Sequence, residues 1–277
     1  MAIVLSLFAA LSYGAADFIG GVVSKRNAVF RVVLISQLFG TIPLLAVFPL
    51  LNDGAFSMSA MWWGSAAGVA GGVGVVLLYQ GLAKGRMSVV APITSVEAAA
   101  VPVMFGLFIG ERPSGWALIG VGVALLAVAL VSSSAHTSPE EGKSGIPEAI
   151  GAGAAFGVFF IVLDQAGDAA GMWPILSMRA TSLVLVAIAM LVTRTSIAPA
   201  AGTFGGIVLS GVLDVAANVL YLLSTQHGLL SLVAVITSMY PAATVVLARF
   251  VLKERLTRNQ LFGLGLAATG VILIAMG

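Results

Sequence analysis

The chain has 277 residues, of which 60% are hydrophobic and only 9% are charged, and its mean hydropathy is +1.10. Ordinary globular domains carry about 25% charged residues. This composition therefore excludes a soluble enzyme, and the lack of a long basic tract disfavours a nucleic-acid binder. The sequence has no cysteine, and its two histidines, His136 and His227, lie far apart. We expect neither a metal site nor another cofactor.

Ten apolar runs follow one another along the chain. Each is long enough for a membrane-spanning helix and too long for a strand of a transmembrane barrel. No basic region precedes the first run, so we expect it to remain as a span and not to be cleaved as a signal peptide. The runs lie at roughly 2–22, 30–51, 61–80, 88–109, 115–134, 147–167, 172–193, 203–223, 231–252 and 259–276.

The two halves of the chain resemble each other. An offset of 143 residues places Ser88–Ser95 on Ser231–Ser238 and Glu111 on Glu254, without a gap. The polar identities within this alignment, such as Thr94 with Thr237, are not explained by apolar composition alone. We therefore predict a first five-helix repeat over 1–134, a polar linker over 135–146 and a second five-helix repeat over 147–277.

The odd number of helices in each half decides the predicted architecture. After five spans the second repeat must enter the membrane from the opposite side. The sequence thus predicts an all-α membrane protein in which ten transmembrane helices form two inverted repeats. Such repeats place a binding site near the middle of the bilayer, between the halves.

The basic residues predict the orientation in the membrane. Alternate loops contain only Arg112, whereas the loops after the first, third, fifth, seventh and ninth helices are basic. The positive-inside rule places the basic loops in the cytoplasm and both termini outside, in the inner or plasma membrane. The basic loops and their flanks hold Lys25, Arg26, Arg31, Lys84, Arg86, Lys143, Arg194, Arg249, Lys253, Arg255 and Arg258.

One pattern occurs near the end of each half. A proline in the fourth predicted helix is followed by a Gly-Glu pair and then by Gly-Val-Gly in the next helix. The residues are Pro102, Gly110, Glu111, Gly120 and Gly122, and in the second copy Pro241, Glu254, Gly263 and Gly265. This pattern resembles the EamA family of the drug/metabolite transporter superfamily. The second copy departs from it, since Lys253 precedes the glutamate and the prolines are not equivalent.

The resemblance implies two inverted five-helix repeats around a central cavity, in transporters that often export amino acids, metabolites or drugs. It specifies no substrate for this chain.

Four ionisable residues lie inside predicted spans, where a charge is costly and marks a functional site by default. They are Asp17, Glu97, Arg179 and Asp214. Asp214 belongs to a stripe of small and polar residues that recurs every fourth position and ends at Asn218. The stripe would present a carboxylate and an amide to a cavity. Alternatively, Asp214 pairs with Arg179 and only joins two helices.

Glu97 lies between Pro92 and Pro102, so we expect its helix to be distorted. Burial would suit Glu97 to carrying a proton, and Glu97 and Asp214 are the candidates for proton coupling. The alternative is a permanently protonated Glu97 that bonds a neighbouring helix. Its counterpart in the second repeat is Tyr240.

Arg179 offers a planar fork of donors that matches a carboxylate or phosphate. It either contacts the substrate or pairs internally with Glu97 or Asp214. Asp17 is either a site residue or the partner of Lys25 or Arg26. The predicted substrate-binding residues are Asp17, Gln37, Tyr79, Glu97, Arg179, Asp214, Asn218 and Tyr240.

Two further features are interpreted as structural. Gly64, Gly68 and Gly72 form overlapping GxxxG patterns, which favour close packing of helices. Glu111 stands beside Arg112, and we expect an ion pair that fixes their loop.

The sequence predicts a secondary transporter that exports a small organic solute by alternating access. A solute with both an amine and a carboxylate, such as an amino acid, would use both signs of charge. An exporter of cationic drugs is the alternative, favoured if Arg179 is already paired with a carboxylate. Catalytic motifs and a Walker A pattern are missing, which disfavours an intramembrane enzyme. The expected partners are the solute, the lipid bilayer and protons, and a monomer would suffice.

Overall fold

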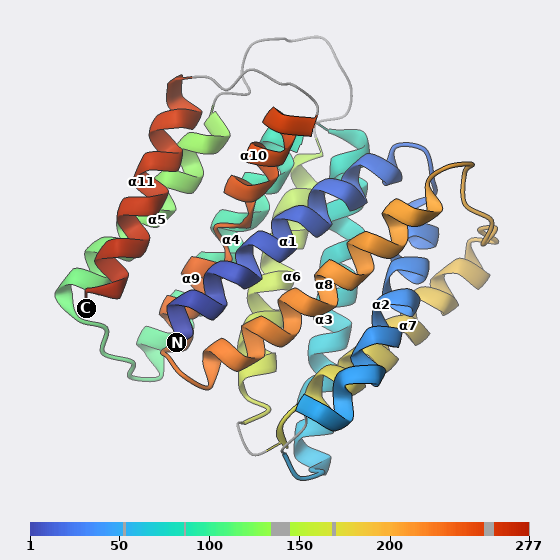
Figure 1. The fold of residues 1–277 in the computed structure, drawn as a ribbon, viewed down its shortest axis with the longest axis horizontal. Helices are drawn as coiled ribbons and strands as arrows, with labels where there is room; N and C mark the ends of the chain where they lie inside the picture. The colour runs from blue at the N-terminus through green and yellow to red at the C-terminus, as the bar shows by residue number, and fades with distance from the viewer. Residues whose placement is uncertain (52–53, 86, 134–144, 168–169, 252–257, 277) are drawn as a thin grey trace.

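The computed structural model describes the chain except for residues 52–53, 86, 134–144, 168–169, 252–257 and 277. The described residues form helices without a strand, as predicted (Figure 1). The predicted linker lies almost entirely outside the described residues. The first half contains α1 (Ala2–Ser24), α2 (Val29–Leu51), α3 (Met58–Lys84), α4 (Met87–Phe108) and α5 (Gly115–Ser133). The second half contains α6 (Ile146–Asp164), α7 (Trp173–Val192), α8 (Phe204–Thr225), α9 (Leu230–Thr237), α10 (Tyr240–Val251) and α11 (Arg258–Ala275).

Within the described residues, six helices are long and apolar enough to cross a membrane: α1, α2, α3, α6, α7 and α8. The apolar parts of α4, α5 and the α9–α10 segment are shorter. Large apolar side chains also cover the outside of the bundle; Phe108 is 89% exposed and Leu191 is 78% exposed. Such a surface suits lipid and not water. The chain is therefore a multi-pass membrane protein.

The run predicted as one helix over 231–252 is interrupted between α9 and α10. Pro241 has no amide hydrogen, and its ring clashes with the carbonyl of the residue four positions earlier in a continuous helix. The amide of Ala242 bonds the carbonyl of Met239 at 2.9 Å. The carbonyl of Ser238 accepts a hydrogen bond from the Ser95 hydroxyl of α4 instead. By contrast α4, which we expected to be distorted, runs without a break.

When two helices pack on each other, their equivalents at the offset of 143 residues also pack on each other. α1 packs on α8, and the counterparts of these helices, α6 and α3, pack on each other. Likewise α2 packs on α8 and α3 on α7, while α4 packs on α6 and α1 on α9 and α10. α5 packs on its own counterpart, α11. Ser95 and Ser238, which are repeat equivalents, also bond to each other.

Both chain termini lie at one end of the bundle, together with the α4–α5 and α8–α9 connections (Figure 1). At the opposite end, polar contacts join the α1–α2 and α7–α8 connections. Asn27 donates to the Thr203 hydroxyl at 3.1 Å and accepts from the Ala200 amide at 2.8 Å. Arg31 donates to the Ser196 carbonyl at 2.6 Å. These contacts join the two halves at the basic end.

Glu111 joins the halves at the end that contains the termini. Its carboxylate accepts hydrogen bonds from the amides of Leu230 at 2.8 Å and Ser231 at 3.1 Å. These amides belong to the first turn of α9, where backbone donors have no partner within the helix. The expected pairing of Glu111 with Arg112 is replaced by this cap, because two amide donors and the positive end of α9 both favour a carboxylate.

Replacing Glu111 by alanine should lower the free energy of unfolding by about 1–2 kcal/mol, the usual cost of losing a helix cap. Glu111→Gln keeps one acceptor oxygen and should lose less. Thermal unfolding of the purified protein in detergent measures the change, with Arg112→Ala as the matched control. Equal losses in Glu111→Ala and Arg112→Ala would show that the ion pair, and not the cap, is the stabilising contact.

Candidate functional site

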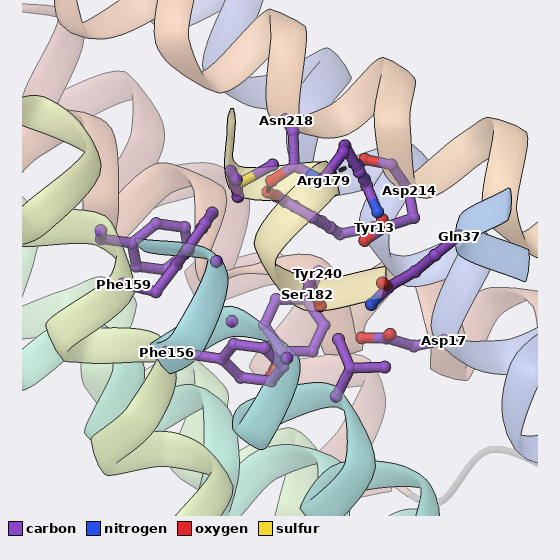
Figure 2. Close-up of a pocket in the computed structure, with 16 residues that line it drawn as sticks. Tyr13, Asp17, Gln37, Phe156, Phe159, Arg179, Ser182, Asp214, Asn218 and Tyr240 are labelled. Carbon is purple, nitrogen blue, oxygen red and sulfur yellow. Dashed lines mark hydrogen bonds and ion pairs between the residues drawn. The ribbon is translucent and has the colours of Figure 1, made fainter. Parts of the chain in front are cut away.

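A cavity of about 610 Å³ lies at the centre of the bundle. This figure counts all the space between the atoms there, including space open to the solvent. Helices of both halves contribute to its wall (Figure 2). The lining residues are Tyr13, Asp17, Gln37, Gly68, Gly71, Gly72, Val75, Phe156, Phe159, Phe160, Met178, Arg179, Ser182, Asp214, Asn218 and Tyr240.

A polar network from three helices forms one side of the cavity. The guanidinium of Arg179 on α7 makes an ion pair with the carboxylate of Asp214 on α8. Asn218, one turn further along α8, donates to the Asp214 carbonyl at 2.6 Å. Tyr13 of α1 donates its hydroxyl to Asn218 at 2.9 Å. The pairing of Arg179 with Asp214, one of the two alternatives from the sequence, is therefore present, and the two charges offset each other.

Asp17 lies on the same side of the cavity, where its carboxylate points towards Gln37 of α2 (Figure 2). Neither a hydrogen bond nor an ion pair reaches Asp17 from any residue that the structure describes. The predicted alternative, an ion pair with Lys25 or Arg26, is thus not formed. With Arg179 and Asp214 offsetting each other, Asp17 is the cavity's uncompensated acidic group among the described residues.

Several polar atoms in the cavity wall have no hydrogen-bond partner among the described residues. They are Oε1 of Gln37, Nε of Arg179, Oγ of Ser182 and the hydroxyl of Tyr240, all buried. A buried polar atom without a partner costs about 1–3 kcal/mol. All four belong to residues that line the one cavity.

The opposite side of the cavity is apolar. It is lined by Phe156, Phe159 and Phe160 of α6 and by Gly68, Gly71, Gly72 and Val75 of α3. A Cβ atom at Gly71 would lie 3.1 Å from the Phe159 ring. The rings thus pack directly on α3 backbone.

The GxxxG glycines of α3 support close packing as predicted, and two of them also line the cavity. A Cβ at Gly64 would meet Pro174 and Ser177 of α7, and one at Gly68 would meet the Met178 backbone. Gly68 and Gly72 appear in the cavity wall as well.

Six of the eight predicted site residues line the cavity: Asp17, Gln37, Arg179, Asp214, Asn218 and Tyr240. Tyr79 does not; it is buried, and its hydroxyl packs against Gly20 of α1. Glu97 is also outside the cavity wall and lies against Gly153 of α6.

The position of Glu97 follows from the packing of α6. Gly153 and Gly157 face α4, where they contact Glu97 and Val101. The phenylalanines of α6 face the cavity. α6 therefore stands between α4 and the cavity, and no α4 residue within the described part of the chain lines it.

The sequence did not single out the aromatic wall or Tyr13 as part of the site. Tyr13 precedes Asp17 by one helical turn, which places both on one face. The spacing of Phe156, Phe159 and Phe160 also fits a single face, but an apolar face in a membrane protein can equally contact lipid. Ser182 follows Arg179 by three residues, and this helical spacing could have placed Ser182 on the same face as Arg179.

A helical multi-pass bundle with a cavity that both halves line, polar on one side and apolar on the other, has the architecture expected of a membrane transport protein. The model of the EamA-like transporter family matches residues 1–133 and 143–276, and the chain belongs to this family. The two matches correspond to the two halves. The resemblance found in the sequence is thus confirmed.

Two further proteins are similar to this chain. An uncharacterised protein of Methanocaldococcus jannaschii is 26% identical over 133 residues, which cover 48% of this chain and 97% of that protein. That protein is therefore about as long as one half of this chain. A crystal structure is similar in fold with a TM-score of 0.74 at 13% identity, over 99% of this chain and 96% of the other.

Proposed function

We propose that the protein is a secondary transporter that exports a small organic solute by alternating access, with the solute bound in the central cavity. The observation that carries the proposal is the cavity itself, which both family repeats line and whose lining residues include buried polar atoms with no partner among the described residues. A solute bound there would supply hydrogen-bond partners to these atoms, which lost their hydrogen bonds to water when they were buried.

The proposed mechanism takes the two halves as inverted repeats of five spans each. If α9 and α10 together form one span, each half contains five. An even total of ten places both termini on one side, and both lie at one end of the bundle (Figure 1). Each packed pair of helices has an equivalent pair in which the two halves are interchanged, and a two-fold axis between the halves produces this pattern. For inverted repeats the axis lies in the membrane plane. By the positive-inside rule this end faces outwards.

The charges in the cavity favour a solute that carries an amine. Arg179 and Asp214 offset each other, so the carboxylate of Asp17 supplies the net charge. An amino acid would place its ammonium at Asp17 and its carboxylate at the free Nε of Arg179. A cationic compound is the second candidate, because the Arg179–Asp214 pair already occupies part of the guanidinium.

Counterflow in proteoliposomes, with a panel of amino acids, sugars and organic cations, tests the transport proposal. For amine-bearing solutes, Asp17→Asn should reduce the rate about tenfold or more, since a hydrogen bond to a charged group contributes about 1.5–3 kcal/mol. Asp164→Asn, outside the cavity wall, is the matched control. Parent-like transport by Asp17→Asn would refute the role of Asp17. Absence of counterflow for every solute in the parent would refute the transport function.

Proton coupling is proposed to use a carboxylate inside the bundle. Glu97 and Asp214 are the candidates from the sequence, and Asp17 joins them because it lines the cavity without an ion-pair partner in the described structure. The same proteoliposomes, driven by a pH gradient, compare Glu97→Gln, Asp214→Asn and Asp17→Asn with the parent. A parent-like response in all three would exclude coupling through these groups.

A further inference from the structure

The cavity is divided between polar and apolar walls that come from different helices. Its charged and amide groups lie on α1, α2, α7 and α8. The wall formed by α3 and α6 contains glycine, valine and phenylalanine alone among its described residues. Figure 2 shows Phe156 and Phe159 on the side away from Asp214 and Gln37. A bound molecule therefore meets a charged surface at one end and an apolar surface at the other.

We propose that the solute is an amphipathic amine whose apolar body lies on the α3–α6 wall, and that Gly71 and Phe159 determine which bodies are accepted. This inference rests on the proposed transport function. Small-molecule sites are mostly apolar, and a few polar groups fix the orientation of the ligand. Here Asp17 and the free polar atoms near it fix the amine, which directs the rest of the solute towards the rings.

Gly71 is suited to set the size of the apolar space. A Cβ at this position would lie 3.1, 3.4 and 3.7 Å from three atoms of the Phe159 ring, and these are its three nearest contacts. A methyl group would therefore press on a side chain and not on backbone. The ring would have to move by a few tenths of an ångström at the cavity wall. By contrast, Gly68 faces the backbone of Met178, so its substitution would disturb helix packing.

A matched control exists at the same helix interface. A Cβ at Gly151 of α6 would lie 3.0 Å from Cδ1 of Leu77 on α3, with no other described atom within 4 Å. Gly151 does not appear in the cavity wall. Gly71→Ala and Gly151→Ala therefore introduce the same methyl group between α3 and α6, but only the first does so at the cavity.

The test compares solutes that share an amine and differ in their apolar body. The pairs are ethylamine with 2-phenylethylamine, and alanine with phenylalanine. The parent should bind and transport the phenyl member at least about tenfold better than the small one. Gly71→Ala should reduce this preference about tenfold, whereas Gly151→Ala should retain it. Phe159→Leu, which makes room for the added methyl, should restore the preference in the Gly71→Ala background.

Equilibrium binding to the detergent-solubilised protein separates this inference from the transport proposal. Discrimination in binding without counterflow would overturn the transport function and leave the assignment of the wall intact. Transport without preference for the phenyl member would overturn the inference. So would a preference that Gly71→Ala and Gly151→Ala change to the same extent.

Discussion

Asp214→Asn should lower the free energy of unfolding by about 3–5 kcal/mol, because it leaves the charge of the buried Arg179 uncompensated. Arg179→Gln should lower it less, because the Asp214 side chain that it leaves unpaired is 24% exposed. Arg179 is only 3% exposed. The double variant Arg179→Gln/Asp214→Asn should recover most of this loss, since it contains neither charge. Thermal unfolding in detergent measures stability, and a double-mutant cycle isolates the energy of the pair.

Arg179→Lys separates the charge from the geometry of the pair. Lysine keeps the positive charge but lacks the planar fork of donors and the Nε of the guanidinium. We expect its stability to lie close to that of the parent while amino-acid transport falls. Additive losses in the cycle, with the double variant as unstable as the sum of the single ones, would contradict a coupled pair. Unchanged amino-acid transport by Arg179→Lys would show that the guanidinium does not bind the solute.

The class of fold could be predicted from the sequence because lipid imposes a simple rule on it. Spanning segments must be long, apolar and helical, so the run of such segments is visible without a structure. The repeat was visible for a related reason. Equivalent helices pack in equivalent environments, so small and polar residues such as Gly14 and Gly157 recur at the same offset. In the structure Gly14 faces Thr244 and Gly157 faces Val101, and these partners are themselves equivalent.

The site could be predicted only in part, because sequence position gives depth in the membrane but not the neighbour on each face. Depth in the predicted spans singled out Asp17, Arg179 and Asp214, and all three line the cavity. The same reasoning placed Glu97 in the site, yet its helix lies behind α6. The apolar wall had no distinguishing signal, since phenylalanine suits lipid and cavity equally well. The α9–α10 break did have a signal in Pro241, although Pro92 and Pro102 drew the expectation to α4.

Gly211→Ala should be among the most destabilising single substitutions, with a loss of about 3 kcal/mol or more, at the upper end of overpacking. A Cβ at this position would fall on the carbonyl group of Ser36, where α8 crosses α2. Backbone atoms cannot rotate away as a side chain can, so the two helices would have to separate. Thermal unfolding in detergent and the yield of monodisperse protein both report the change.

Gly205→Ala on the same helix is the control for Gly211→Ala. No described atom lies within 4 Å of a Cβ at Gly205, and alanine in a helix is about 0.5–1 kcal/mol more favourable than glycine. This variant should be as stable as the parent or slightly more so.

Gly68 is the repeat equivalent of Gly211 and faces the Met178 carbonyl of α7, so Gly68→Ala should resemble Gly211→Ala. If Gly211→Ala were as stable as Gly205→Ala, the close approach of α8 to α2 would be refuted. A tolerated Gly68→Ala beside a damaging Gly211→Ala would show that the two crossings, although equivalent in sequence, differ in how tightly they pack.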